Sequence, residues 1–400
     1  MPALSERAIH LPASPIRKLV PYAEAAKQRG VHVYHLNIGQ PDIETPPRYF
    51  EAIRKAEPKV LAYSHSAGIE TLRRAIAAYY DRIGYPVTPG QVIVTTGASE
   101  ALSFVFASCM NPDDEIIIPE PFYANYNSFS MFTNAKVVPL VTKIENDFAL
   151  PPIEEFEKLI TPRTKAILIC NPGNPTGILY PQEALEKLRE IILRHDLYLI
   201  SDEVYREFAY DGLTHHSVLG LEGAENHVIV TDSISKRFSA CGARIGCVVS
   251  RNAGVMDAVL RLAQARLAPP TMEQIGAEAV YGLPQTFFDS VAEEYVSRRD
   301  LLLERLSQME GVRCPHVNGA FYAMVELPVE DSDHFCRWML EDFAHQGATV
   351  MMAPGGGFYS DPEKGRRQVR VAYVLNKADL KKAMDCLEAG LKAYALAGFK

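Results

Sequence analysis

The chain has 400 residues, of which 48% are hydrophobic and 22% are charged. Its 49 acidic residues outnumber its 41 basic ones, and the net charge of −8 argues against nucleic-acid binding, which needs a basic face. A chain of this length is expected to form two domains rather than one core.

Apolar runs and cysteines indicate where the protein is located and whether it binds a structural metal. No apolar run approaches the ~20 residues that span a bilayer, and the first residues contain no apolar stretch typical of a secretory signal. The seven cysteines are scattered without a CxxC pair, which is typical of free thiols in a reducing compartment. We therefore expect a cytoplasmic protein with no structural zinc. His215 and His216 are expected to lie in a loop, because no other metal-ligating residues cluster near them.

The first two thirds of the chain alternate short apolar segments with amphipathic ones. Strands are predicted at 91–96, 114–120, 164–170, 197–201, 227–232 and 244–250. Helices are predicted at 98–110 and 181–196, and in the second the apolar residues recur at a spacing near 3.6. This alternation predicts βαβ units and a mostly parallel sheet covered on both faces.

After about Phe288 the pattern changes. A long helix is predicted at 287–310, an apolar segment lies at 319–327, and a helix at 331–347, a strand at 368–374 and a helix at 377–398 follow. This order favours a smaller α+β domain. The expected division is an N-terminal segment, 1–45, that joins the small domain, a large domain, 46–288, and a small domain, 289–400.

Ligands bind at the carboxyl ends of strands in open parallel sheets, so the residues after each strand are candidate site residues. Gly97, Ala98 and Ser99 follow the first predicted strand and open a helix. Backbone N–H groups at a helix N-terminus favour an anion such as a phosphate. The alternative is a tight turn with Ser99 as an N-cap.

Two further strands end in polar residues. The stretch NPGNPTG, 171–177, predicts a rigid loop that is longer than a simple turn needs, and Asn174 could offer an amide to a site. Asp202 follows the strand at 197–201, where a carboxylate is costly unless it meets a cation, and Tyr205 is within reach of the same pocket. The alternatives are plain turn chemistry for the loop and a helix N-cap at Asp202.

Two cations complete the set. Lys236 follows the strand at 227–232, with Arg244 eight residues later. A lysine in a strand-end pocket can become a nucleophilic amine, and the alternative is a solvated surface lysine. Arg370 lies between Val369 and Val371 on a predicted strand. It suits bidentate binding of a carboxylate, and the alternative is an edge-strand arginine that faces water.

A lysine amine, a carboxylate for a ring nitrogen, an anion cradle and an arginine for a substrate carboxylate are the groups that a pyridoxal phosphate enzyme needs. With NPGNPTG, SDEVY and SxSK followed by Arg244, the chain resembles class I/II aminotransferases of PLP fold type I, in the aspartate aminotransferase superfamily. The resemblance extends from about Leu36 to Arg370. It implies an α/β fold with a large domain built on a mostly parallel seven-stranded sheet and a smaller α+β domain.

The resemblance also implies roles for matching residues. Lys236 would carry pyridoxal 5'-phosphate as an internal aldimine, and Asp202 would pair with the ring nitrogen. Tyr205 and Asn174 would hydrogen-bond the ring hydroxyl oxygen. The residues implied to hold or surround the phosphate are Gly97, Ala98, Ser99, Ser233, Ser235 and Arg244.

Four further positions match the family. Tyr123 would stack on the cofactor ring. Tyr63 would reach the phosphate in the neighbouring subunit, which implies a homodimer. Gly39 and Arg370 would bind the α-carboxylate of the substrate, together with Asn174.

The implied activity is amino-group transfer between an L-amino acid, aspartate or a related one, and a 2-oxo acid such as 2-oxoglutarate. It would follow ping-pong kinetics and serve amino acid metabolism. Some acid-specific relatives carry a lysine where this chain has Ser99, and others take an arginine from the partner subunit. A preference for aromatic or apolar amino acids and a PLP β-lyase therefore remain alternatives. Arg237 is a candidate for a distal carboxylate, the segment around Ile16 for the side-chain pocket, and the glycine-rich loop 353–360 for the substrate entrance.

Overall fold

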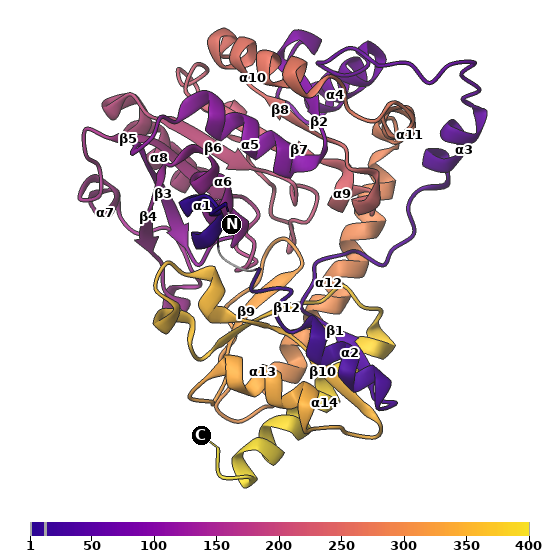
Figure 1. Ribbon diagram of the computed structural model, residues 1–400, viewed down its shortest axis with the longest axis vertical. Helices are drawn as coiled ribbons and strands as arrows, with labels where there is room; N and C mark the ends of the chain where they lie inside the picture. Colours follow the sequence, from indigo (N-terminus) through magenta and orange to yellow (C-terminus); the bar gives the residue numbers. More distant parts are fainter. Residues whose placement is uncertain (1, 12–13, 400) are drawn as a thin grey trace.

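The computed structural model describes residues 2–11 and 14–399. Figure 1 shows a larger unit built around one sheet, a smaller unit below it, and the long helix α12 (Gln285–Ser307) running between the two. The predicted boundary at residue 288 falls within this helix. Its predicted start at 287 is close to the observed Gln285.

A seven-stranded sheet forms the larger unit, in the order β2-β8-β7-β6-β5-β3-β4. Its strands are β2 (Val92–Thr95), β3 (Glu115–Glu120), β4 (Lys136–Val141), β5 (Thr164–Cys170), β6 (Tyr198–Asp202), β7 (Val228–Ser233) and β8 (Gly246–Val249). Only β8 runs antiparallel to its neighbours β2 and β7. The mostly parallel seven-stranded sheet predicted from the sequence is therefore confirmed.

The central strands are buried on both faces because successive side chains point to opposite sides. On β5, Ile167 and Ile169 belong to one buried hydrophobic cluster, whereas Ala166 and Leu168 belong to another on the opposite face of the sheet. The helices around this sheet are α3 (Pro47–Lys55), α4 (Glu70–Arg82), α5 (Gly97–Cys109), α6 (Asn125–Thr133), α7 (Ile153–Glu157), α8 (Gln182–His195), α9 (Ile234–Arg237), α10 (Ala253–Arg266) and α11 (Thr271–Tyr281).

The smaller unit contains two small sheets. In one, β1 (His32–His35) pairs in parallel with β10 (Ala348–Met351), and in the other β11 (Ala353–Pro354), β12 (Gln368–Ala372) and β9 (Tyr322–Glu326) are antiparallel. Its helices are α2 (Val20–Gln28), α13 (Ser332–Glu341) and α14 (Lys377–Leu396). Since α2 and β1 come from the start of the chain, the N-terminal segment is part of this unit's core.

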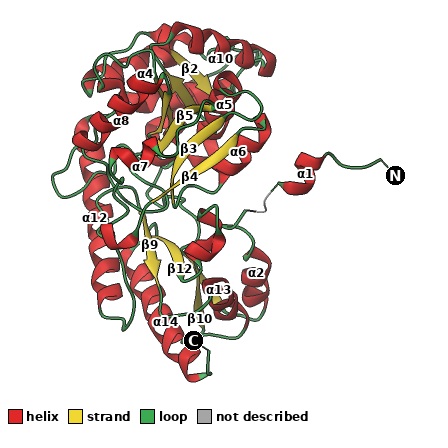
Figure 2. Cartoon of the chain, turned by 90° about the vertical axis from the view of Figure 1, so that its left-hand side faces the viewer, coloured by secondary structure: helices red, strands yellow, loops and turns green. Residues whose placement is uncertain are grey.

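Helix α1 (Glu6–His10) lies at the edge of the molecule in Figure 2, and its Arg7 Nη1 donates to the backbone oxygen of Phe132 at 3.4 Å. Its Ile9 is 63% exposed. Among the residues that the structure describes, no helix is both long and apolar enough to cross a membrane.

Candidate active site

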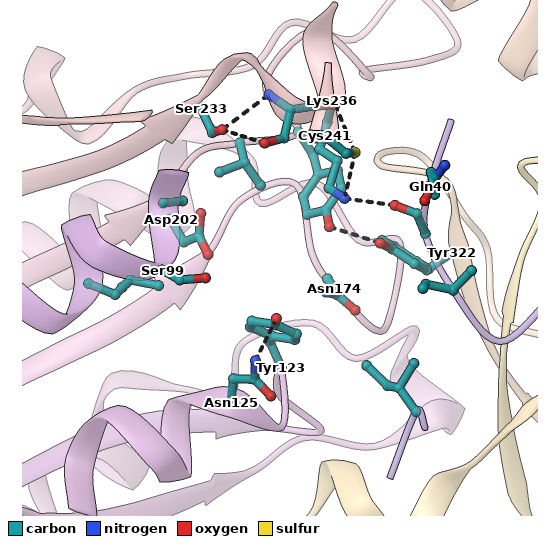
Figure 3. A pocket seen from close by; sticks show the side chains of 18 of the residues that line it. Gln40, Ser99, Tyr123, Asn125, Asn174, Asp202, Ser233, Lys236, Cys241 and Tyr322 are labelled. Atoms are coloured by element: carbon teal, nitrogen blue, oxygen red, sulfur yellow. Dashed lines mark hydrogen bonds between the residues drawn. The ribbon is translucent and has the colours of Figure 1, made fainter. Parts of the chain in front are cut away.

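A cavity of about 530 Å³ opens where the two units meet, at the carboxyl ends of β5, β6 and β7. Figure 3 shows side chains from both units converging on it. The predicted site residues line this cavity, except Gly97, Tyr63 and the candidate Arg237. The lining residues are Ser14, Ile16, Arg17, Ile38, Gly39, Gln40, Ala98, Ser99, Leu102, Tyr123, Asn125, Asn174, Asp202, Val204, Tyr205, Ser233, Ser235, Lys236, Cys241, Arg244, Tyr322 and Arg370.

Lys236 projects into the cavity from α9, a single helical turn that follows β7. Its Nζ donates a hydrogen bond to the backbone oxygen of Gly39 at 2.7 Å and lies 3.7 Å from Cys241 Sγ. A Cβ at Gly39 would lie 1.7 Å from Tyr322 Oη, so this close approach requires glycine. The amine is therefore held by one neutral backbone acceptor inside a ligand-sized space.

Asp202 ends β6 and is almost fully buried. Its Oδ2 accepts a hydrogen bond from Tyr126 Oη at 2.9 Å, whereas Oδ1 has no partner among the described residues. Burial raises the pKa of Asp202 to about 7, against the opposing effect of the Tyr126 hydrogen bond. An orphaned buried carboxylate oxygen indicates that a cationic or N–H partner belongs there.

The start of α5 forms a cradle for an anion. Gly97 has φ +75°, and a Cβ there would lie 2.2 Å from Arg244 Nη2, so glycine lets this guanidinium approach the helix N-terminus. Gly246 has a matching role, because its Cβ would lie 2.7 Å from the backbone nitrogen of Ala98. Backbone N–H groups and one arginine therefore converge, as phosphate binding requires.

Hydroxyls from the end of β7 close the cradle. Ser233 Oγ accepts a hydrogen bond from Ser235 N at 3.1 Å and lies 2.8 Å from Ser235 Oγ. The nearby carboxylate of Glu100 does not line the cavity, since it caps Thr96 N at 2.7 Å and pairs with Arg266 at 2.7 Å. The anion cradle therefore keeps its positive character.

Arg370 enters the cavity from β12 of the smaller unit and is buried. It donates to Asn174 Oδ1 at 2.9 Å and to the backbone oxygen of Asn37 at 2.5 Å, and its guanidinium lies over the rings of Tyr322 and Phe358 at 4.6 and 5.0 Å. Burial lowers the pKa of Arg370. Because these partners are neutral, the fork remains able to bind a carboxylate.

Three tyrosines line the remaining walls of the cavity: Tyr123, Tyr205 and Tyr322. Tyr205 Oη lies 2.9 Å from Tyr322 Oη, and Asn125 Nδ2 donates to Tyr123 Oη at 2.9 Å. Burial raises the pKa of Tyr123 to about 12. In Figure 3, Tyr123 lies across the open space from Lys236. A flat ligand between them would have an aromatic neighbour on one side and the amine on another.

The sequence did not reveal several residues of the site. Tyr322 bonds Tyr205 and packs on Arg370 from the smaller unit, and nothing in its local pattern distinguished it from core residues. Cys241 and Gln40 also line the cavity. Tyr126, which donates to Asp202 Oδ2, lies in α6, three residues after Tyr123, which precedes this helix.

Arg237 does not line the cavity. It is 1% exposed, binds Asp232 Oδ2 at 2.8 Å and lies over the ring of Tyr79 at 4.4 Å. It is therefore not placed to bind a distal carboxylate. Tyr63 is 81% exposed and lies outside the cavity, in the segment between α3 and α4. His215 is buried beside Glu203, and no cluster of metal-ligating side chains occurs among the described residues.

Known proteins resemble this chain over nearly its whole length. Residues 31–387 match the family model described as aminotransferase class I and II. A probable aspartate/prephenate aminotransferase of Thermus aquaticus is 34% identical over 96% of this chain and 98% of its own length. An aromatic-amino-acid aminotransferase of Thermococcus litoralis is 31% identical over 98% of this chain and 100% of its own.

Solved structures agree with the sequence relatives. An aspartate aminotransferase of Thermus thermophilus superposes with a TM-score of 0.88 at 32% identity, over 98% of this chain and 100% of that one. An alanine aminotransferase of Pyrococcus furiosus gives a TM-score of 0.89 at 32% identity, with the same coverage. The chain belongs to the class I and II aminotransferase family.

Proposed function

We propose that this aminotransferase binds pyridoxal 5'-phosphate at Lys236 and moves an amino group between an L-amino acid, aspartate or a related one, and a 2-oxo acid such as 2-oxoglutarate. Members of the family use this cofactor. The observation that carries the proposal is the convergence of three groups on one cavity: the Lys236 amine, the unpaired Oδ1 of Asp202 and the Arg370 fork.

The residues present fit the cofactor. In the cradle of Gly97, Ala98 and Arg244, Gly97 carries no Cβ. A phosphate could therefore contact the backbone at this position directly. The orphaned Asp202 oxygen suits the protonated nitrogen of a pyridine ring. Tyr205 and Asn174 would contact the ring hydroxyl oxygen, and Tyr123 would cover one ring face.

When bound, pyridoxal phosphate supplies a conjugated ring that draws electrons from the substrate Cα. Asp202 would hold a proton at the ring nitrogen and so keep the ring electron-poor. Lys236 Nζ would take the proton from the substrate Cα and deliver it to the C4′ carbon of the cofactor, as general base and then acid. Arg370 would orient the substrate by its α-carboxylate. Because donor and acceptor use the same cavity in turn, ping-pong kinetics are expected.

The range of substrates is supported by the relatives, whose names include the amino acids aspartate and alanine, aromatic amino acids, and the oxo acid prephenate. The relatives reported above are all named aminotransferases, so a β-lyase activity has no support among them. A role in the biosynthesis of amino acids follows from the same names. Free cysteines throughout the chain suit a reducing compartment, the cytoplasm.

We also propose a homodimer in which Tyr63 reaches the phosphate of the neighbouring subunit. The segment that carries it exposes Val60 (76%), Leu61 (65%) and Tyr63 (81%). Apolar side chains that gather on one exposed segment are typical of an interaction surface.

Purified protein loaded with pyridoxal phosphate tests the function directly. Incubated with 2-oxoglutarate and a panel of amino donors, it should form glutamate from at least one of them. Lys236→Ala should lower that rate by at least about a hundredfold, because the proton-moving amine is lost. Lys165→Ala, which removes an exposed lysine of β5, is the matched control and should not lower it. Substantial transfer by Lys236→Ala would overturn the proposed role of this lysine.

A further inference from the structure

The cavity contains one cation that the proposed chemistry does not use. The cationic side chains that line it are Arg17, Lys236, Arg244 and Arg370. The last three face the amine, phosphate and α-carboxylate positions of the proposed function. Arg17 lies in the segment that precedes α2, on the side of the cavity that Ile16 and Ser14 also line.

Arg17 has no ionic partner among the residues that the structure describes. Across residues 2–11 and 14–399, no carboxylate forms an ion pair with its guanidinium, whereas the next residue, Lys18, pairs with Asp333. Arg17 is nevertheless close enough to the cavity wall to act on it: burial raises the pKa of Tyr123, and the charge of Arg17 opposes that rise. The guanidinium is thus available to an anion that enters the cavity.

The backbone around Arg17 is fixed relative to Arg370. Asn37 is buried, its side chain donates to the backbone oxygen of Ile16 at 3.0 Å, and its own backbone oxygen accepts from Arg370 Nη2 at 2.5 Å. One residue therefore connects the arginine of the α-carboxylate position to the segment that carries Arg17. This connection positions the backbone beside Arg17 relative to Arg370.

A second contact holds the same segment from outside. A Cβ at Gly357 would lie 2.2 Å from Pro15 Cβ, so the glycine-rich loop 355–357 packs directly against the residue before Ile16. Phe358, which follows this loop, lies over Arg370. The segment 14–17 is thus held between Asn37 and the loop, with Arg17 facing the cavity.

We propose that Arg17 binds the distal carboxylate of the substrate, so that this enzyme prefers dicarboxylic amino acids and the matching 2-oxo diacids. The inference rests on the proposed function and adds the residue that selects the side chain. Two arginines at opposite ends of a substrate would each bind one carboxylate, which a monocarboxylic amino acid cannot satisfy. The neutral Ser99, where acid-specific relatives carry a lysine, is then compensated from the N-terminal segment.

The test compares Arg17→Met with Lys18→Met in the cofactor-loaded protein. Lys18→Met removes the neighbouring cation outside the cavity and controls for general charge. Arg17→Met should lower kcat/KM for aspartate and glutamate by roughly 10- to 100-fold, which is the effect of losing one charged hydrogen-bonding group. The kcat/KM for alanine should change by no more than about threefold, because alanine has no distal carboxylate to lose a partner. Arg17→Lys should recover part of the loss.

Calorimetric titration with maleate and with butyrate gives a readout that needs no turnover. Maleate, a dicarboxylate, should bind Arg17→Met roughly 10- to 100-fold more weakly than wild type, and butyrate should bind both alike. The inference would be overturned if Arg17→Met lowered kcat/KM equally for aspartate and alanine, or if Arg17→Met and Lys18→Met lowered kcat/KM for aspartate equally. The aminotransferase function would stand in either case. If no donor is turned over, the proposed function fails, and the maleate titration still decides whether Arg17 binds a dicarboxylate.

Discussion

The Asp202 carboxylate lies at the end of β6 with one oxygen bound to Tyr126 and the other unpartnered. Burial raises its pKa from 3.8 to about 7 in the cofactor-free protein. Between these two values the folded protein binds more protons than the unfolded chain does. The contribution of Asp202 to the free energy of unfolding is therefore most favourable at low pH. It falls as the pH rises toward about 7 and does not change further above that value.

Asp202→Asn should remove this dependence. As the pH rises from about 5 to about 8, the unfolding free energy of the cofactor-free variant should increase relative to that of wild type by roughly 2–3 kcal/mol. Denaturant unfolding of both proteins at several pH values measures this difference. Saturation with pyridoxal phosphate should abolish or reverse the trend, because the cofactor supplies the missing partner in wild type. A pH-independent difference would contradict the description of Asp202 as an uncompensated buried acid.

Two glycines bring β8 and the start of α5 together. Gly246 begins β8, and its missing Cβ leaves space for the backbone of Gly97 and Ala98, where contacts would otherwise be 2.6 and 2.7 Å. The anion cradle depends on this approach, because Arg244 reaches the helix N-terminus only where Gly97 also lacks a side chain.

Gly246→Ala should push α5 away from β8 and weaken cofactor binding by about tenfold or more, the usual effect of overpacking such a contact. Gly242→Ala is the matched control, since nothing lies within 4 Å of a Cβ at that position of the same segment. Absorbance titration of the cofactor-free variants with pyridoxal phosphate gives both dissociation constants. Similar affinities for the two variants would show that this contact does not shape the cradle.

Most elements of the large sheet were predictable because β5, β6 and β7 are continuous apolar runs buried on both faces. Strand β4 was not predicted, since it is half exposed and contains Pro139, as an edge strand can.

The predicted helix 331–347 was too long. It ends at Glu341, and the chain turns back through the bridge between His345 and Ala348 into β10. That ending depends on pairing with β1, which lies more than 300 residues away.

From the residues alone, the site was predictable where it lies at strand ends, whereas Gly39 and the segment around Ile16 were assigned only through the family resemblance. Lys236, Asp202 and Asn174 follow strands of the large sheet, so their shared location followed from the alternation alone. Tyr322 and Arg17 reach the cavity because the smaller unit and the N-terminal segment pack across it. Local sequence contains no information on that arrangement.

The whole molecule presents an exposed segment between α3 and α4 that its own fold does not cover, on the right of Figure 1. In the proposed homodimer, each site takes Lys236 from one subunit and Tyr63 from the other. Tyr63→Phe should weaken cofactor binding by roughly 10- to 100-fold, because one hydrogen bond to a charged phosphate is lost.

Mixing the Tyr63→Phe and Lys236→Ala proteins tests that arrangement. After subunit exchange at limiting cofactor, each mixed dimer should contain one site with both native residues, so activity should exceed the sum of the separate proteins. Activity no greater than that sum would contradict the sharing of Tyr63 across the interface.

The central claim is that one cavity of this chain accepts an amino group and passes it on. Cofactor-loaded protein mixed with glutamate alone should release about one equivalent of 2-oxoglutarate per subunit and then stop, as a ping-pong transfer requires. Oxaloacetate added next should be converted to aspartate in the same amount. Absence of the first product, or its continued release without an acceptor, would contradict the account.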